Sequence, residues 1–258
     1  MNTNLLTVAG LEIHSPEKRL CGPLSFTLNP GDRLGILGQN GTGKTTLLHT
    51  LMGLQPVRQG RVQIGPRPLD DWRGQQLAQQ IGILFQAVPD EMPATVYEAV
   101  MLGRLPYARH WQWENDEDHT IVQQALRTME LDHLSSRDIN HLSGGERQRM
   151  AIAALIAQRP RILLLDEPSN HLDISFQIKA LRHLAETVTG QDRAMIMATH
   201  DINLAARFCN RILLLRADGK HLLGSAGAVL DADHLSAAFQ CQVAVVSTGS
   251  GTVYYPVV

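Results

Sequence analysis

Residues Gly38–Thr45 read Gly-Gln-Asn-Gly-Thr-Gly-Lys-Thr, and this stretch decides the fold. Two glycines separated by four residues are followed directly by Lys and Thr. The apolar run Leu34–Leu37 precedes the stretch, and Leu47, Leu48 and Leu51 follow it at helical spacing. A strand, a glycine-rich loop and a helix in this order form the setting in which the pattern binds the phosphates of a nucleoside triphosphate.

Each part of this loop suits one task in holding a triphosphate. The glycines allow positive φ angles, so that consecutive N–H groups point at one anion. Lys44 is expected to reach the β- and γ-phosphates, and the Thr45 hydroxyl to hold Mg²⁺. The alternative is a chance glycine-rich turn, which the flanking strand and helix patterns disfavour. The residues predicted to bind the nucleotide here are Gly38, Gln39, Asn40, Gly41, Thr42, Gly43, Lys44, Thr45 and Thr46.

The composition of the 258 residues is ordinary for a globular protein, with 44% apolar and 19% charged residues. The length suits one large domain, or a core with a smaller subdomain. A net charge of −2 gives no support to nucleic-acid binding. Cys21, Cys209 and Cys241 lack the spacing of a metal site and predict reduced thiols in a cytosolic protein. No apolar run approaches the ~20 residues of a membrane span, and no signal-peptide core is present, so work at a membrane would go through partners.

Aliphatic runs alternate with helical patterns along much of the chain, which predicts an α/β fold with a mainly parallel sheet. Such a sheet binds its ligand at the carboxyl ends of the strands. Early β-rich pieces predict a small antiparallel sheet beside this core. The predicted strands are residues 5–8, 11–14, 24–28, 33–37, 61–64, 81–85, 162–165, 194–198 and 211–215. The tail from Gly219 onward carries no readable motif.

A helical block interrupts the core. Capping boxes at Thr95 with Glu98 and at Ser143 with Glu146 predict two helix starts, and residues 119–131 carry apolar residues at helical spacing. After the strand at 162–165, the pattern predicts a helix with Ile174, Ile178, Leu181 and Leu184 on one face. We therefore predict a single domain over residues 1–258. In it, residues 1–88 and 159–258 form the nucleotide-binding core with its β subdomain, and residues 89–158 form an inserted helical subdomain.

Two carboxylates follow the aliphatic run at 162–165. Asp166 suits a contact to hydrated Mg²⁺, and Glu167 suits a general base or an orienter for attacking water. The alternative roles are a helix-capping Asp and a surface Glu. The phosphate loop earlier in the chain makes the catalytic interpretation the better one.

Residues 142–148 read Leu-Ser-Gly-Gly-Glu-Arg-Gln and resemble the signature sequence of ATP-binding-cassette (ABC) ATPases. Physically, the segment is a helix N-terminus with a Ser cap and two glycines, which makes a second anion site. Two phosphate-binding segments in one chain predict a head-to-tail homodimer. The resemblance implies that each ATP lies between the phosphate loop of one subunit and the signature helix of the other. It assigns ATP contacts to Ser143, Gly144, Gly145 and Glu146.

Three further motifs match this family in their order. Gln86 matches the glutamine that senses Mg²⁺ or water and links to the transport partner, and residues 170–173 resemble the loop that crosses the dimer interface. His200 matches the histidine that contacts the γ-phosphate; a capping or core histidine is the alternative. The implied assignments are ATP and Mg²⁺ as cofactors, Asp173 as a further nucleotide contact, Glu167, His200 and Gln86 as catalytic residues, and Thr45, Gln86 and Asp166 as metal-binding residues.

A narrower resemblance points to one branch of the family. Residues 102–107, 114–118 and 167–173 are similar to the importer ATPases for iron-siderophore, haem and vitamin B12, with Ser169 where Thr is commoner. This implies a peripheral protein on the cytoplasmic face of the inner membrane that hydrolyses ATP to power uptake of an iron chelate, haem or cobalamin. The implied partners are two permease subunits and an external substrate-binding protein, with no nucleic acid. Trp111 and Trp113 would pack the helical subdomain or contact the permease.

Two other classes of protein share parts of this pattern. Ribosome- and chromosome-associated ABC ATPases carry two cassettes or long coiled coils, and this chain shows neither. A P-loop kinase or GTPase for a small substrate lacks the segment at residues 142–148. The register of the aromatic residue that stacks on adenine in ABC ATPases falls near His14 and Ser15, with no Tyr, Phe or Trp close by. The sequence therefore predicts that the base is held differently.

Overall fold

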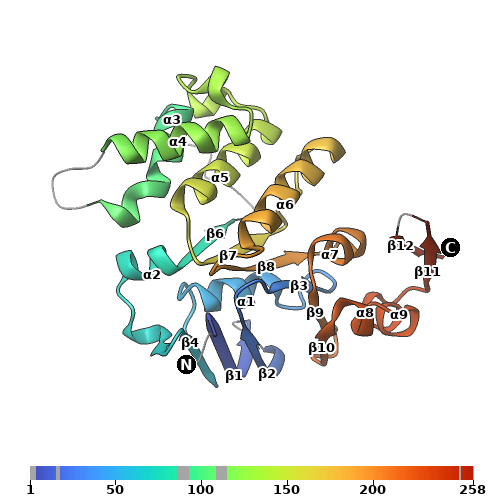
Figure 1. Ribbon diagram of the computed structural model, residues 1–258. Coiled ribbons are helices and arrows are strands. Elements are labelled where there is room, and N and C mark those ends of the chain that lie inside the picture. The colour runs from blue at the N-terminus through green and yellow to red at the C-terminus, as the bar shows by residue number, and fades with distance from the viewer. Residues whose placement is uncertain (1–3, 16–17, 86–92, 109–114, 250, 258) are drawn as a thin grey trace.

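The computed structural model describes residues 4–15, 18–85, 93–108, 115–249 and 251–257. Within these residues the chain forms a six-stranded sheet, a four-stranded sheet and a two-stranded hairpin (Figure 1). The strands are β1 (Leu6–His14), β2 (Arg19–Leu28), β3 (Arg33–Leu37), β4 (Arg61–Ile64), β5 (Arg67–Pro68), β6 (Ile81–Leu84), β7 (Ile162–Asp166), β8 (Ala194–Thr199), β9 (Arg211–Leu215), β10 (His221–Ser225), β11 (Val243–Thr248) and β12 (Gly251–Pro256).

Helices connect most of these strands. The α-helices are α1 (Lys44–Leu51), α2 (Gly74–Gln80), α3 (Val96–Met101), α4 (Asp116–Thr128), α5 (Gly144–Gln158), α6 (Ile174–Val188), α7 (Ile202–Phe208), α8 (Ala226–Val229) and α9 (Ala232–Phe239). Short 3₁₀ helices occupy Leu69–Asp71, Leu102–Tyr107, Asp132–Leu134 and Ile139–His141.

The six-stranded sheet has the order β10-β9-β3-β8-β7-β6. All neighbouring strands in it are parallel except β10, which pairs antiparallel with β9. The four-stranded sheet, β2-β1-β4-β5, is antiparallel throughout its described pairs. The prediction of a mainly parallel core with a small antiparallel sheet beside it is confirmed.

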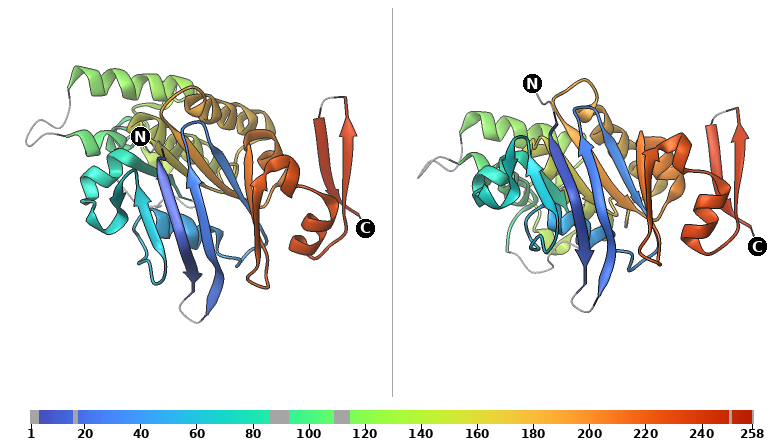
Figure 2. Two further views of the ribbon diagram at one scale, coloured as in Figure 1. Left: turned by 60° about the horizontal axis from the view of Figure 1, so that its bottom comes forward. Right: turned by 90° about the horizontal axis from the view of Figure 1, so that it is seen from below.

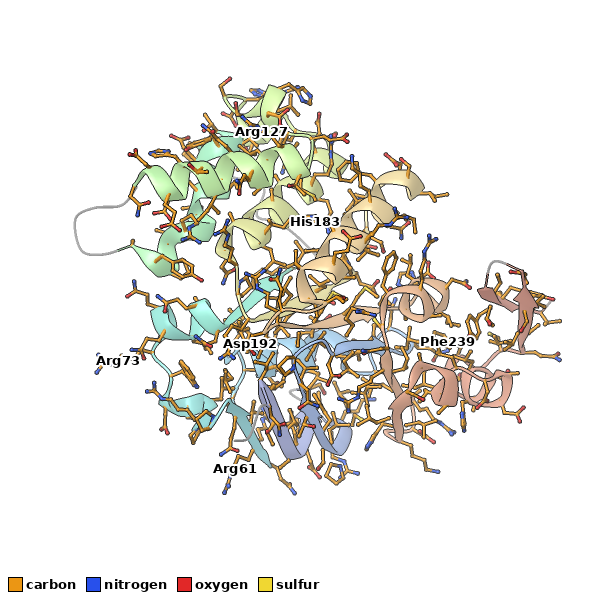
Figure 3. The ribbon with its side chains drawn as sticks, viewed as in Figure 1. Arg61, Arg73, Arg127, His183, Asp192 and Phe239 are labelled. Atoms are coloured by element: carbon orange, nitrogen blue, oxygen red, sulfur yellow. The ribbon has the colours of Figure 1, made fainter. Side chains whose placement is uncertain are left out.

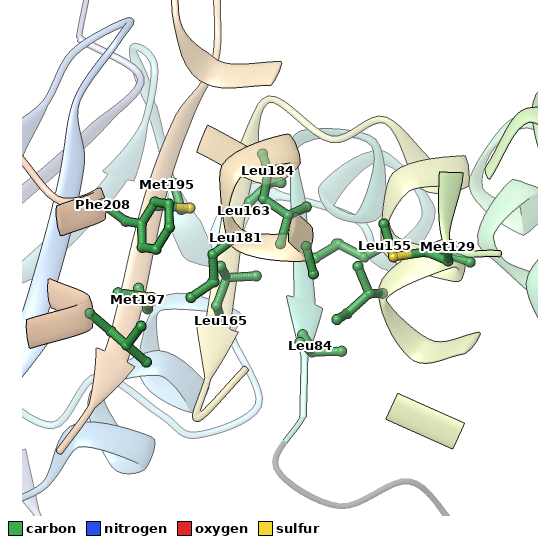
Figure 4. Close-up of a cluster of buried hydrophobic side chains, with 14 of the residues drawn as sticks. Leu84, Met129, Leu155, Leu163, Leu165, Leu181, Leu184, Met195, Met197 and Phe208 are labelled. Atoms are coloured by element: carbon green, nitrogen blue, oxygen red, sulfur yellow. The ribbon is translucent and has the colours of Figure 1, made fainter. Parts of the chain in front are cut away.

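Successive side chains of a strand point to opposite faces, so the aliphatic strands of the parallel sheet serve two cores. In β7, Ile162 and Leu164 belong to the core shared with α1 and the antiparallel sheet. Leu163 and Leu165 belong to the core that lies under α5, α6 and α7 (Figure 4). Burying each such side chain contributes roughly 1.5–3 kcal/mol, and the central strands are therefore held rigidly between two layers.

Helices α3, α4 and α5 pack together away from the antiparallel sheet (Figure 1). Both predicted capping boxes are present: Thr95 and Glu98 begin α3, and Ser143 and Glu146 begin α5. Reciprocal bonds of this kind satisfy N–H groups that the first helical turn leaves without partners. The division of the chain at residues 88 and 159 stays a prediction.

The structure differs from the sequence prediction at several places. The pieces at 5–8 and 11–14 form one strand, β1, whose pairing with β2 shifts register along its length. β6 ends at Leu84, and Phe85 is 42% exposed because the chain leaves the sheet beyond the Leu84–Leu165 pair. Ile174 is 80% exposed, so it does not share the buried face of α6, whereas Leu181 and Leu184 do. α4 begins at Asp116, capped by Asn115, and ends at Thr128.

The tail beyond residue 219, for which the sequence suggested no motif, forms β10, α8, α9 and the β11–β12 hairpin. Figure 2 shows the hairpin at one edge of the molecule, opposite the helices α3 and α4. These elements are short, with none longer than eight residues, which explains why periodicity alone did not reveal them. In the described part of the chain, every helix is too short or too polar to cross a membrane.

Candidate functional site

Three neighbouring strands of the parallel sheet deliver the predicted site residues to one edge. β3 lies between β9 and β8, and β8 lies between β3 and β7. Leu37 at the end of β3 pairs with Thr199 at the end of β8, and Asp166 at the end of β7 pairs with Ala198. The phosphate loop follows directly after β3, His200 follows directly after β8, and Glu167 follows directly after β7. Parallel strands bring such residues together at their carboxyl edge.

The loop after β3 has the conformation of an anion cradle. Gly43 adopts a φ of 103° immediately before α1. A Cβ atom on Gly38 would lie 2.6 Å from the carbonyl oxygen of Leu215, so only glycine fits there. Lys44 Nζ donates to the carbonyl oxygen of Gly38 at 2.8 Å and lies 3.3 Å from that of Gln39. The Lys44 ammonium is thus folded back onto the loop that it is expected to serve.

A cavity of about 270 Å³ opens over this loop. Its lining brings the loop together with the carboxylate that follows β7. The lining residues are Leu20, Asn40, Gly41, Gly43, Lys44, Thr45, Thr46 and Glu167. The lining of this cavity, among the residues that the structure describes, includes no member of the Ser143–Glu146 segment.

Lys44 carries its charge in a buried position. Its side chain is 7% exposed, and Glu167 Oε1 lies 3.9 Å from Nζ. Burial lowers the pKa of Lys44, and the charges of Glu167 and Asp166 oppose this shift. Buried ammonium groups need anionic partners. A bound triphosphate would supply further negative charge to the same ammonium.

Glu167 sits in an unusual backbone conformation. Its φ is 47°, in the left-handed region that non-glycine residues rarely enter, and its N–H donates to the carbonyl oxygen of Ala198 at 2.9 Å. The side chain is nearly buried, and His200 Nδ1 lies 3.0 Å from Oε2. Strained positions of this kind cluster at functional sites. In this conformation the Glu167 carboxylate lies within 3.9 Å of Lys44 Nζ and 3.0 Å of His200 Nδ1.

Asp166 and Thr45 form the predicted metal position. Burial raises the pKa of Asp166, and a hydrogen bond from the Thr45 side chain opposes the shift. Asp166 Oδ1 is buried and has no hydrogen-bond partner among the described residues. An unsatisfied buried carboxylate oxygen beside a hydroxyl is the donor set that Mg²⁺ and its bound waters prefer. The residues present therefore fit the predicted ion.

The predicted second phosphate-binding segment, at the start of α5, contacts the turn that follows β7. Gln148, buried in α5, donates from Nε2 to the carbonyl oxygen of Pro168 at 3.1 Å. A Cβ atom on Gly145 would lie 3.0 Å from the carbonyl oxygen of His171, so the start of α5 lies directly against this turn. Pro168 follows Glu167 in sequence. Movement of α5 would therefore shift the turn that carries Glu167.

The acidic side chains of this region have structural partners already. Glu146 accepts bonds from the N–H and hydroxyl of Ser143, and these bonds lower its pKa. Asp173 caps α6 by accepting from the N–H of Phe176 at 2.9 Å. The carboxylates thus shape the helix ends, and the capping box of α5 does not use the backbone N–H groups of Gly144 and Gly145.

Some residues fall outside these contacts. Gln86, Trp111 and Trp113 lie outside the described residues. Leu20 and Gln148 belong to the site but were missed by the sequence prediction. Gln148 lies within the recognised segment at 142–148, which was the available signal, whereas nothing in the sequence distinguishes Leu20 from other strand leucines.

Comparison with known proteins decides the family. Residues 21–170, more than half of the chain, match the family described as ABC transporter. The chain belongs to the ABC transporter family. As a member of this family it binds ATP, and it is an ABC-type ATPase.

Relatives and solved structures cover almost the whole of this ABC transporter protein. The hemin import ATP-binding protein HmuV of Pseudomonas fluorescens is 39% identical over 249 residues, which cover 93% of this chain and 94% of that protein. A solved structure of a metal-chelate type ABC transporter in an inward-facing conformation is similar with a TM-score of 0.84 and 29% identity, covering 99% of this chain and 98% of that one. A dimeric ATP-binding cassette in a post-hydrolysis state, bound to ADP and Pi, is similar with a TM-score of 0.75 and 26% identity, over 86% of this chain and 98% of that one.

Proposed function

We propose that this chain is the ATP-hydrolysing subunit of an importer for an iron-siderophore or a related metal chelate such as haem or cobalamin. The observation that carries the proposal is the meeting of Lys44, Glu167 and His200 at the carboxyl ends of three adjacent strands. Two of the similar proteins are a hemin import subunit and a metal-chelate type transporter, which supports the choice of cargo class.

In this proposal the loop at residues 38–46 binds the triphosphate through its N–H groups and the start of α1. Lys44 leaves the carbonyl oxygens of Gly38 and Gln39 and turns to the β- and γ-phosphates. Glu167 orients the attacking water and accepts its proton. His200, already 3.0 Å from Glu167, contacts the γ-phosphate from the end of β8.

Thr45 and Asp166 would hold Mg²⁺, with Gln86 as a further ligand by resemblance to the family. The bound ion would neutralise charge on the β- and γ-phosphate oxygens. Burial of Asp166 and its hydrogen bond to Thr45 keep the carboxylate oriented for this role. Thr45 lies in the first turn of α1 and Asp166 ends β7, so two different elements would hold the metal ion.

The nucleotide site would be completed by a second copy of the chain. Residues 143–146 begin α5, and its capping box does not use the N–H groups of Gly144 and Gly145; none of the four residues contributes to the described lining of the cavity over the phosphate loop of their own chain. We infer that they bind the γ-phosphate of ATP held by the partner subunit. The similar dimeric cassette bound to ADP and Pi supports a homodimer.

The remaining partners follow from the cargo. A transporter that imports a chelate needs a membrane path, so we propose two permease subunits, with an external binding protein that delivers the cargo. The ATPase would then be peripheral, on the cytoplasmic face of the membrane. Gln86 would link ATP hydrolysis to the permease.

Uptake by reconstituted vesicles tests this proposal. The chain is co-purified with the permease encoded beside its gene, and ATP-dependent uptake of haem, a ferric siderophore and cobalamin is compared. We expect Mg²⁺-dependent ATP hydrolysis, uptake of one of these chelates, and loss of both activities in Lys44→Ala. ATP hydrolysis without transport of any chelate, together with co-purification with ribosomes or DNA, would show a non-transport ABC ATPase instead.

A further inference from the structure

The side chain of Gln39 joins the phosphate loop to the far end of the sequence. Its Nε2 donates to the carbonyl oxygen of Phe239 at 2.6 Å, across 200 positions of sequence. Phe239 is the last residue of α9, and Figure 3 labels it among the C-terminal elements. The last carbonyl groups of a helix lack partners within the helix. Gln39 thus caps α9 from the phosphate loop.

The backbone of Gln39 is held from the other side. Its carbonyl oxygen accepts from Thr42 Oγ1 at 2.8 Å and lies 3.3 Å from Lys44 Nζ. One residue therefore connects the inside of the loop, where the phosphates would bind, with a helix outside it. Rotation of the Gln39 peptide would disturb both sets of bonds at once.

Helix α9 provides a fixed support for this contact. Leu235 and Ala238 on α9 are almost fully buried in the core that also contains α7 residues. Ser236 Oγ accepts from the N–H of Val243 at 2.9 Å, which ties the β11–β12 hairpin to the same helix. The hairpin is in turn bonded to α7, where Asn203 exchanges two hydrogen bonds of 2.9 Å with the backbone of Tyr254.

The loop has a physical need for such support. Gly41 has a φ of 80° and no atom within 4 Å of where its Cβ would be, so its position in the middle of the loop is not restrained by packing. Ordering a glycine-rich loop when a ligand binds costs conformational entropy. A contact that orders the loop beforehand reduces this cost and tightens binding.

We propose that Gln39 is a positioning residue that pre-organises the phosphate loop by anchoring it to α9, so that the C-terminal elements α9, β11 and β12 contribute to nucleotide affinity. The proposal rests on the proposed function in one respect, namely that this loop binds ATP. Gln39 acts through the loop backbone; its side chain faces α9.

The test replaces Gln39 by Met, which has similar length and no N–H donor. We expect the dissociation constant for ATP to rise two- to tenfold, with a matching rise in KM, because one hydrogen bond of ordinary strength is lost. The kcat at saturating ATP should stay within twofold, and the melting temperature without nucleotide should fall by no more than about 2–4 °C. Gln242→Ala, an exposed Gln in the same C-terminal segment, is the matched control and should bind ATP as the original chain does.

A double-mutant cycle separates the anchor from a purely local effect. Leu235→Ala removes buried volume from α9 and should also weaken ATP binding. Leu235→Val removes less volume, and it replaces Leu235→Ala in the cycle if the Ala variant does not fold. The double variant combines Gln39→Met with Leu235→Ala. If α9 acts through Gln39, its dissociation constant for ATP should be at most about twofold higher than that of whichever single variant binds ATP less tightly. Unchanged affinity in Gln39→Met, or effects that multiply in the double variant, would overturn the proposal. Failure of the original chain to bind ATP would overturn the proposed function instead.

Discussion

The Glu167 carboxylate is shared between His200 and Lys44: His200 Nδ1 lies 3.0 Å from Oε2, and Lys44 Nζ lies 3.9 Å from Oε1. The three side chains come from the ends of β7 and β8 and from the start of α1. In the structure Glu167 balances the buried Lys44 charge. Once Lys44 turns to the phosphates, the same carboxylate would be released to act on water. This exchange of partners would couple nucleotide binding to the assembly of the catalytic site.

The first prediction concerns Glu167→Gln. The amide keeps the shape of the side chain but cannot accept a proton as a base, so hydrolysis should fall by roughly 10²–10⁴-fold. ATP binding should persist, and the ATP-bound dimer should accumulate. Phosphate release and size-exclusion chromatography with ATP measure the two effects. Near-normal hydrolysis would show that Glu167 is not the base.

The second prediction concerns sharing of the site between subunits. Lys44→Ala and Ser143→Arg should each strongly impair nucleotide trapping by the homodimer, because each removes one side of every nucleotide site. Mixing the two variants builds heterodimers in which one site has lost both residues and the other keeps both. Trapping of fluorescent ATP should then recover in part.

A control mixes each variant with additional copies of itself, which should trap no nucleotide. Subunit exchange is verified separately with differently tagged copies of the original chain. If exchange occurs and the Lys44→Ala and Ser143→Arg mixture still traps no ATP, the composite site is wrong.

The sequence predicted the local parts of this structure well. The strand Arg33–Leu37 and the start of α5 after the Ser143 cap agree with the prediction, because aliphatic runs and capping boxes encode short-range structure. The prediction that Ile174 shares the packed face of α6 was wrong, because periodicity gives the direction of a helix face but not where along the helix its packing begins. The bond between Gln39 and Phe239 was beyond prediction, since only the folded topology brings them together.

The candidate site also combines features that the local sequence predicts with features that only the folded structure provides. The motifs identified the residue types, but two features depend on how β7 and β8 lie side by side. These are the left-handed backbone of Glu167 and the Asp166 Oδ1, which has no hydrogen-bond partner among the described residues. A pattern of residues can name a carboxylate and its neighbours in sequence. It cannot supply the direction in which the carboxylate points.

The third prediction concerns the buried ion pair between the 3₁₀ helix at 102–107 and α4. Arg104 Nε donates to Asp118 Oδ1 at 2.7 Å, and its Nη1 donates to the carbonyl oxygen of Ala157 at 2.8 Å. Both side chains are less than a tenth exposed. Arg104→Met leaves the Asp118 charge buried without its partner, so the free energy of unfolding should fall by about 3–5 kcal/mol.

Urea denaturation measures this loss, and the structure offers a matched control. Arg161 pairs with Asp192 on the surface (Figure 3 labels Asp192), so Arg161→Met should cost at most about 1 kcal/mol. Replacing both buried partners, in Arg104→Met with Asp118→Leu, should restore part of the stability. Equal losses at the buried and the surface pair would contradict the assignment.

The fourth prediction concerns pH and the capping box of α5. Bonds from the N–H and hydroxyl of Ser143 lower the pKa of Glu146. A carboxyl with a lowered pKa in the folded state binds fewer protons than in the unfolded chain. Its stabilisation is therefore present above the ordinary value of 4.5 and is lost as pH falls through the folded-state pKa.

Glu146→Gln should thus reduce stability at pH 6 by about 0.3–1 kcal/mol, the usual value of a charge at a helix N-terminus. The difference between this variant and the original chain should shrink as pH falls below 4.5. Unfolding curves at pH 6, 5, 4 and 3.5 measure it. A difference that stays constant across this range would mean that the charge of Glu146 contributes nothing.

The last prediction concerns the nucleobase. A cavity of about 230 Å³ lies beside the phosphate loop and shares Thr46 with the cavity over it. His14 lines this second cavity; its Nε2 lies 3.2 Å from Glu12 Oε2, and Arg19 holds the other oxygen of Glu12 at 2.8 Å. The lining, as far as the structure describes it, contains an imidazole and no Tyr, Phe or Trp. The base would therefore meet a small, polar surface.

Stacking of a base on an aromatic ring is worth about 1–3 kcal/mol in nucleic-acid binders, and an imidazole is expected to supply the low end of that range. We therefore expect weak discrimination between bases, with GTP hydrolysed at a rate comparable to that of ATP. His14→Ala should weaken ATP binding by about 1 kcal/mol or less. His14→Tyr should tighten it, because a larger ring covers more of the base. Binding curves for ATP and GTP on the three proteins measure these effects. A strong preference for ATP that neither substitution alters would show that another part of the protein holds the base.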